Sequence, residues 1–203
     1  MKIYCDLTDN DGEFIVKISR KIVTDYLNNQ SFEFDESFKE NFSFNSGVFV
    51  TLMKQNDLRG CIGYPISDRE FHSTLEDSAI AAATKDPRFP PLTKDELSEV
   101  NFEVTILSEP EIISVNDPME YPSKIKIGRD GLIIKRSFYS GLLLPQVPIE
   151  YGWNEKQFLE QTCQKAGLEK NCWLSKDVTI EKFQGIVFAE ESPNGRVVRK
   201  LSS

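Results

Sequence analysis

Apolar residues in the first thirty positions recur every three or four residues, which is the spacing of one face of an α-helix. This period predicts a first helix over residues 10–29. The segment that follows, QSFEFDESFKENFSFNSG, keeps neither the helical nor the strand period for long. We therefore expect a loop whose exposed phenylalanines, between Phe32 and Phe44, either cover a subunit contact or fill a groove.

Alternation of apolar and polar positions predicts strands further along the chain. GVFVTLMK and LRGCIGY, joined by a QND turn, indicate an antiparallel hairpin. VNFEVTILS indicates a half-buried strand with Glu103 on the face opposite its apolar residues. Three more segments have strand character: KIKIGRDGLIIKR as two strands around residues 128–131, GLLLPQV up to Pro145, and KFQGIVFAEE before a polar tail.

A second helix is predicted after the hairpin. Ser67 with Glu70 fits a capping box, and the apolar spacing that follows closes before Pro87. DPRFPPL then predicts a rigid loop, because its prolines can continue neither a helix nor a central strand. Thr93 with Glu96 marks a short turn of helix after this loop.

The order of these elements favours an α+β fold. A last helix is expected from Asn154, capped with help from Gln157, to Gly167. Strands outnumber helices, the hairpins are short and no run of βαβ units appears. The sequence thus predicts a mainly antiparallel sheet flanked by helices, in one domain that spans residues 1–203.

Composition narrows the class of protein. The formal net charge is −8 and no basic cluster is present, which makes nucleic acid an unlikely partner. No apolar run approaches the ~20 residues that span a bilayer, and the first residues lack the hydrophobic stretch of a signal peptide. We expect a soluble, cytoplasmic protein with no membrane contact.

Cysteine and histidine usage argues against a metal site or cofactor. The four cysteines form no CxxC pair, and His72 is the only histidine, expected on an exposed helix surface. The GRDG turn does not open a helix and has no character of a phosphate-binding loop. The expected compartment is reducing, so all four thiols are predicted to be free, with Cys163 and Cys172 as packing residues.

The segment LRGCIG combines a charge, a thiol and two glycines within six residues. Because alternate side chains of a strand share a face, Arg59 and Cys61 are expected to point one way, and Leu58 and Ile62 toward the core. A guanidinium nearby would favour thiolate over thiol. It could also hold a carboxylate or phosphate by two parallel hydrogen bonds.

Two interpretations of this segment remain open. Gly60 and Gly63 leave room for a ligand, another backbone or a bend in the sheet. In the functional interpretation Cys61 is reactive or lies beside an anion held by Arg59. In the structural interpretation Cys61 is a small buried hydrophobe, as free cysteines commonly are.

Other polar residues are candidates for the same site. Asp86 and Arg88, in the proline-stiffened loop, suit either a precise site or a cap with a surface salt bridge. Glu103 is either solvated or a carboxylate that lines a cleft beside an arginine, where a raised pKa would make it a general base. Gln146 could bind a ligand or cap exposed backbone.

Seven ordered segments make the chain resemble the AMMECR1 family over nearly its whole length. They are GVFVTL, LRGCIG, DPRFPPL, FEVTILSEP, GRDGLII, GLLLPQV and the spaced W, FL, TC, KAGL, W pattern near residues 153–173. LRGCIG is the hallmark of the family. Two positions depart from its pattern: Tyr64-Pro65 follows the hallmark, and Asp130 stands where relatives often carry a histidine, which weakens any imidazole-based mechanism.

The resemblance carries expectations for fold and partners. It implies an α+β body built from both chain ends, a smaller middle portion, and a cleft where the two meet. It also implies an association with Memo-like or radical-SAM proteins, which family genes accompany in prokaryotes. It implies no reaction.

Two functions are therefore weighed. In the favoured one, the cleft around LRGCIG binds a small anionic ligand or a partner, through Arg59, Gly60, Gly63, Arg88 and Gln146. In the alternative, Cys61 is a nucleophile that acts on an anionic small molecule or modified protein, with Asp86 or Glu103 moving protons. Catalysis needs a matched acid, base and nucleophile, and only the nucleophile is persuasive.

Overall fold

The chain folds into two compact units in a computed structural model that describes residues 4–65 and 68–200. Unit 1 contains residues 4–108 and 186–200, and unit 2 contains residues 109–185. The boundary near the C-terminus falls within strand β7 (Thr179–Glu190), between Gly185 and Ile186. The strand pairings are antiparallel, so the predicted α+β class is confirmed.

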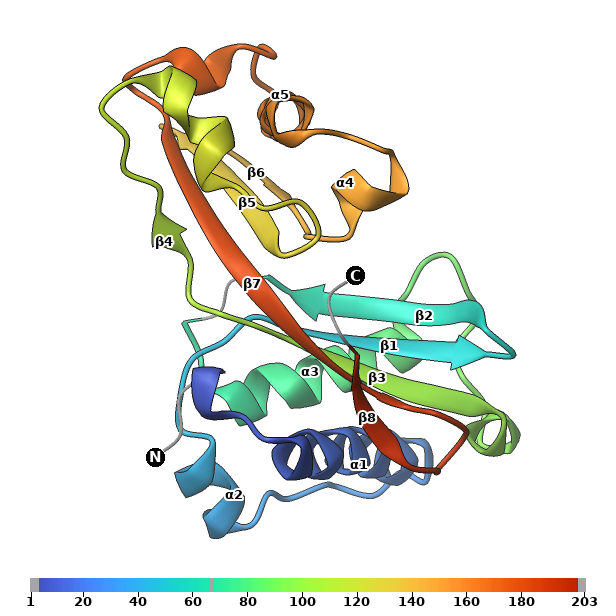
Figure 1. Ribbon diagram of the computed structural model, residues 1–203. Helices are drawn as coiled ribbons and strands as arrows, with labels where there is room; N and C mark the ends of the chain where they lie inside the picture. Colours follow the sequence, from blue (N-terminus) through green and yellow to red (C-terminus); the bar gives the residue numbers. More distant parts are fainter. Residues whose placement is uncertain (1–3, 66–67, 201–203) are drawn as a thin grey trace. The chain divides into compact units, whose positions relative to one another are not determined.

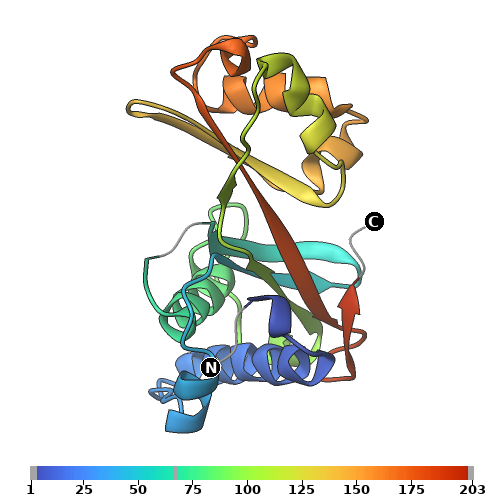
Figure 2. The ribbon, with the colours of Figure 1, turned by 60° about the vertical axis from the view of Figure 1, so that its left-hand side comes forward.

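Unit 1 is a sheet with two long helices on one face. Its strands follow the order β2-β1-β3-β7, with β8 also paired to β7. Helices α1 and α3 lie on the same side of strands β1–β3 (Figures 1 and 2). The elements are η1 (Tyr4–Asp6), α1 (Asp9–Leu27), α2 (Glu36–Asn41), β1 (Val48–Lys54), β2 (Asp57–Tyr64), α3 (Phe71–Thr84), η2 (Asp95–Ser98), β3 (Val100–Leu107) and β8 (Val197–Lys200).

The core of unit 1 follows the period-two pattern of β1 and β3. Val48, Val50 and Leu52 are fully buried. They lie opposite Ile106, Val104 and Phe102 of β3, which are also fully buried. Helices α1 and α3 contribute Ile15, Val16, Leu75 and Ala79 to the same cluster. Alternation thus directs every second side chain of each strand into the core.

The predicted loop at residues 30–47 contains a helix, so that prediction is wrong. Asp35 caps α2 by accepting a hydrogen bond from the N–H of Phe38 at 2.7 Å. Phenylalanines on and beside α2 pack as a ring cluster against Phe71 of α3, which removes them from the surface. The buried rings are Phe34, Phe38, Phe42 and Phe44.

Helix α3 begins later than its predicted capping box. Ser67 lies outside the described residues. Glu70 occupies the N-cap position without a side-chain cap bond, and Phe71 is the first helical residue. The end of the helix agrees with prediction, because Thr84 comes before Pro87.

Unit 2 packs one amphipathic helix against a four-stranded part of the sheet. Here β7 lies between β4 and β5, and β6 pairs with β5. Helix α5 begins with the predicted capping box, formed by Asn154 and Gln157. The elements are β4 (Glu111–Ile112), η3 (Pro118–Lys124), β5 (Asp130–Arg136), β6 (Tyr139–Leu143), α4 (Val147–Glu150), α5 (Glu155–Lys165) and η4 (Cys172–Leu174).

Two strand predictions near the C-terminal half need correction. KIKIGRDGLIIKR forms only β5, because the N–H groups of Arg129 and Asp130 close a turn on the carbonyl of Lys126. The Asp130 carboxylate, which is fully buried, accepts from the N–H of Lys126 in return at 2.9 Å. The predicted polar tail after residue 190 contains a further strand, β8, which pairs with β7.

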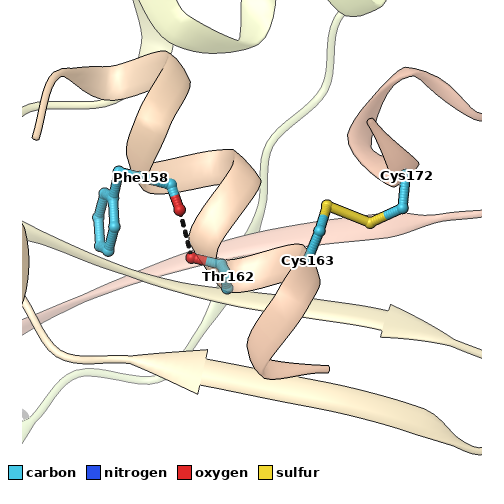
Figure 3. The surroundings of a disulfide bond; sticks show 4 residues. All are labelled: Phe158, Thr162, Cys163 and Cys172. Atoms are coloured by element: carbon cyan, nitrogen blue, oxygen red, sulfur yellow. Dashed lines mark hydrogen bonds between the residues drawn. A yellow bond between two sulfur atoms is a disulfide. The ribbon is translucent and has the colours of Figure 1, made fainter. Parts of the chain in front are cut away.

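The prediction that all thiols are free is wrong. Cys163 of α5 and Cys172 of η4 form a disulfide, with Cα atoms 6.0 Å apart (Figure 3). Both cysteines are buried in the core of unit 2. The neighbouring Thr162 is also buried, and its hydroxyl donates a hydrogen bond to the carbonyl of Phe158 at 2.7 Å. The two cysteines were correctly predicted to be packing residues. Sequence could not show the bridge, because a spacing of nine residues gives no sign of which side chains meet in space.

We expect loss of this disulfide to destabilise unit 2. Replacing Cys163 and Cys172 together by alanine frees the loop between them in the unfolded chain, which should cost about 2–3 kcal/mol of unfolding free energy. Trp153 and Trp173 are the two tryptophans of the chain and both lie in unit 2, so their fluorescence during urea unfolding reports this unit. Cys61→Ser is the control, and an unchanged midpoint in the double variant would contradict the prediction.

None of the helices in the described residues combines the length and apolar character that crossing a membrane requires.

Candidate functional site

The LRGCIG segment lies on β2, paired with β1 as the predicted hairpin. The register pairs Cys61 with Thr51 and Ile62 with Val50, but it shifts between the next pairs, Leu52 with Gly60 and Met53 with Leu58. Arg59 is therefore an extra residue in a β-bulge. Because of the bulge, residues before Arg59 point to the opposite face from the one that regular alternation would give them. Leu58 lies opposite half-exposed Met53, so the prediction that Leu58 shares the core face with Ile62 is wrong.

The thiol belongs to the sheet face that points away from the core of unit 1. Cross-strand partners share a face, so Cys61, Thr51 and Glu103 form one row across β2, β1 and β3. Each of these side chains is half-buried. We call this surface the Cys61 face; its other members are Phe49, Met53, Asn101 and Thr105.

The two glycines of the segment allow close backbone approach. A Cβ on Gly60 would lie 2.2 Å from the carbonyl oxygen of Ala82 on α3. A Cβ on Gly63 would lie 2.3 Å from the carbonyl oxygen of Val48. Of the three predicted reasons for these glycines, the structure shows a neighbouring backbone at both, and Gly60 also adjoins the bulge at Arg59.

Strand β2 is the edge of the sheet, and the DPRFPPL loop covers it. The Asp86 carboxylate accepts a hydrogen bond from the N–H of Cys61 at 2.9 Å, and Arg88 donates to the carbonyl of Cys61 at 3.3 Å. Two side chains thus satisfy backbone groups that a further strand would otherwise bond. Asp86 and Arg88 also bond each other through two guanidinium nitrogens, at 2.9 and 2.7 Å.

Arg59 is engaged by the same loop and the turn that follows it. Its guanidinium forms a fork with Glu96, with both nitrogen to oxygen distances at 3.0 Å. It also donates to the carbonyl of Pro90 at 3.0 Å. Glu96 accepts from the N–H of Thr93 as well, which is one half of the predicted capping box. A side chain with these partners holds the loop in place along the hairpin.

These ion pairs lower the pKa of both carboxyl groups. Hydrogen bonds from Arg88 hold the pKa of Asp86 well below its usual range, and the N–H of Cys61 adds to the effect. The Arg59 guanidinium lowers the pKa of Glu96 to about 2. Both groups stay ionised at neutral pH and are poor proton acceptors, because a general base works best with a pKa near the working pH.

The thiol of Cys61 is held in its protonated form. Burial raises its pKa, and this outweighs two opposing effects: the hydrogen bond from the Thr51 hydroxyl at 3.2 Å and the charge of Arg88. The functional interpretation, in which the Arg59 guanidinium favours a thiolate, does not describe the resting protein, because the positive charge that acts on this thiol is that of Arg88. The negative charges of Glu103 and Asp86 also raise this pKa.

The remaining candidates lie apart from this cluster or have partners of their own. Glu103 pairs with Lys200 of β8 at 2.5 Å. His72 is not the solvated residue predicted, since its side chain is 15% exposed and packs edge-on against Phe34. Gln146 is exposed at the start of α4 in unit 2, and its role as a ligand contact stays a prediction.

Sequence reasoning missed three residues that contact the candidate site residues: Thr51, Glu96 and Lys200. Thr51 could have been found from the hairpin register, because it lies opposite Cys61 on a strand that was correctly predicted. Glu96 was assigned only a capping role, and nothing local connects it with Arg59, 37 residues away. Lys200 lies in the predicted polar tail. Within residues 4–65 and 68–200, no three metal-ligating side chains gather into a metal site.

The fold and this cluster define a class of protein: an α+β chain whose glycine-containing hairpin is bound along its edge by a proline-rich loop. The AMMECR1 family model matches residues 16–188, and the chain belongs to this family.

Similar proteins come from archaea. Protein MJ0810 of Methanocaldococcus jannaschii is 48% identical over 196 residues, covering 96% of this chain and 97% of that protein. Protein NEQ441 of Nanoarchaeum equitans is 48% identical over 178 residues, covering 87% and 99%. The crystal structure of the uncharacterised protein PH0010 from Pyrococcus horikoshii matches with a TM-score of 0.83 and 43% identity, over 96% and 98% of the two chains.

Proposed function

We propose that this protein is a binding module whose Cys61 face receives a ligand or partner that carries an anionic group. Arg88 supplies the charged contact, and Thr51 and Cys61 supply the adjoining surface. Arg59, Asp86 and the two glycines of LRGCIG hold this surface in shape. Glu103, in the same row of the sheet, is proposed to contribute to the orientation of the ligand. The Memo-like and radical-SAM proteins implied by the family resemblance are the partners to test first.

The observation that carries this proposal is the position of Arg88 at the edge of β2. Its side chain is 54% exposed although its Nε and Nη2 atoms are held by Asp86 and the Cys61 carbonyl. A guanidinium fixed in this way loses little side-chain entropy when it binds an anion, so it is pre-organised for that role. Arg59, in contrast, is 12% exposed and has its donors directed at Glu96 and two proline carbonyls.

A titration with inorganic phosphate and with malonate tests the anion contact. We expect saturable shifts of the backbone amide signals of Cys61 and Arg88 in 15N-labelled protein, at constant ionic strength. Arg88→Gln should weaken binding at least fivefold, which is the scale of one charge-assisted hydrogen bond. Arg69→Gln is the matched control, because this arginine of unit 1 is also exposed and paired with an aspartate. Equal binding in the two variants, or no saturable shift, would remove Arg88 from the role.

The alternative function, a cysteine nucleophile, has one observation in its favour. Thr51 and Arg88 both act to lower the pKa of the Cys61 thiol, so a substrate that displaced Asp86 from Arg88 would increase this effect. Among residues 4–65 and 68–200, no group that could remove the proton forms a hydrogen bond with the sulfur. Thr51 donates to the sulfur, and the nearby carboxyl of Asp86 has a depressed pKa.

The reactivity of Cys61 separates the two functions. Because burial raises its pKa, we expect Cys61 to react with iodoacetamide more slowly than N-acetylcysteine at pH 7.5, with a rate that rises as the pH approaches the raised pKa. Thr51→Val should slow the reaction further at neutral pH, since it removes a hydrogen bond that favours the thiolate. Mass spectrometry of the peptide that contains Cys61 gives the rate, with Cys61→Ser as the blank. A rate above that of the free thiol would favour the nucleophile.

A further inference from the structure

A pocket distinct from the Cys61 face lies between the end of α1 and the middle of α3. Its volume is about 130 Å³, and all its lining residues belong to unit 1. Two isoleucines form its apolar part, Ile22 from α1 and Ile80 from α3. The other lining residues are Tyr26, Gln30, Ser31, Phe32 and Glu76.

One acidic side chain lines this apolar pocket. Glu76 is half-buried on α3, and among the described residues no hydrogen bond or ion pair reaches its carboxylate. Burial raises its pKa, the charge of Asp77 adds to this, and His72, one turn earlier on α3, opposes it. A partly desolvated carboxylate without a partner gains more from an incoming cation than a solvated one does.

The same pocket has two aromatic walls. Tyr26 and Phe32 line it from the end of α1 and from the segment that follows. The ring of Phe32 already lies 5.8 Å from the ammonium of Lys21, which is paired with Asp25 at 2.8 Å. This contact shows that the ring interacts with an ammonium group in the folded protein. Aromatic faces attract organic cations. A carboxylate beside such faces adds a negative charge, which favours a cation over a neutral ligand.

We propose that this pocket binds an alkylammonium group, with the ammonium between Glu76 and the aromatic side chains of Tyr26 and Phe32. The alkyl part lies against Ile22 and Ile80. The group could belong to a free amine or to a lysine side chain, because the pocket recognises chemistry that the two share. This site is independent of the anion contact at Arg88.

A titration with n-butylammonium chloride, at an ionic strength kept constant with sodium chloride, tests the proposal. We expect saturable shifts of amide signals at the end of α1 and the middle of α3, with a dissociation constant on the order of millimolar for so small a ligand. Glu76→Gln should weaken binding at least fivefold, and Phe32→Leu about threefold, because the first removes the charge and the second only one ring face. Asp77→Asn is the matched control and should change the affinity less than twofold.

Two further probes identify what the pocket recognises. 1-Butanol has the same alkyl chain without the charge and should bind at least fivefold more weakly. Nα-acetyl-lysine methylamide tests the lysine source against butylammonium: tighter binding of the lysine derivative favours a protein side chain, and equal or weaker binding favours a free amine. The absence of saturable shifts with butylammonium, equal binding of 1-butanol, or full affinity in Glu76→Gln would each overturn the proposal.

Discussion

Gly60→Ala is expected to lower the unfolding free energy of unit 1 by at least about 3 kcal/mol, a value typical of severe overpacking. The added Cβ would lie 2.2 Å from the carbonyl oxygen of Ala82. That oxygen is part of the backbone of α3, so no side chain can rotate away to make room. Strand β2 and α3 would have to separate, which opens the core between them.

Urea unfolding followed by far-UV circular dichroism measures this loss, because both tryptophans lie in unit 2 and do not report on unit 1. Gly152→Ala is the matched control. A Cβ at Gly152 meets nothing within 4 Å, and the cost there comes only from a backbone φ of +65°, about 1 kcal/mol. If Gly60→Ala cost no more than Gly152→Ala, the close approach of β2 and α3 would not be what requires this glycine.

Asp86→Ala is expected to cost about 3 kcal/mol or more, because it removes one partner of a network whose other members stay in place. The Asp86 side chain is 2% exposed. Without it, the N–H of Cys61 loses its acceptor at the sheet edge and Arg88 loses its counter-charge. Asp177→Ala is the control. This aspartate also pairs with an arginine at 2.7 Å but is 58% exposed, so its loss should cost at most about 1 kcal/mol.

The contribution of Asp86 to the free energy of unfolding should also depend on pH. Its pKa in the folded protein is depressed, so the carboxylate stabilises the fold fully above its unfolded pKa of about 4, and this stabilisation is lost as the pH falls toward the folded value. The difference in unfolding free energy between the natural protein and Asp86→Ala should therefore shrink between about pH 5 and pH 2. A difference that stayed constant over this range would mean that packing of the side chain, and not its charge, stabilises the loop.

The comparison of Asp86 with Arg59 shows why side-chain roles were hard to predict. Both were candidate site residues, and each forms an ion pair with bonds to the backbone. Asp86 and Arg88 are two residues apart, so a local salt bridge was a natural alternative in the sequence. The partner of Arg59, Glu96, is 37 residues away, and the bulge that places Arg59 outside the regular register leaves no signature in the alternation.

The amino-acid sequence by itself determined the elements whose signals are local: helix α1, the β1–β2 hairpin, strand β3, the capping box of α5 and the α+β class. Apolar period and capping chemistry act within a few residues, so they can be read along the chain. Tertiary structure alone decided the Cys163–Cys172 bridge, the burial of the phenylalanines around α2, the loop that covers the edge of β2 and the raised pKa of Cys61. Each of these depends on desolvation or contact between segments distant in sequence, and a linear pattern contains no measure of either.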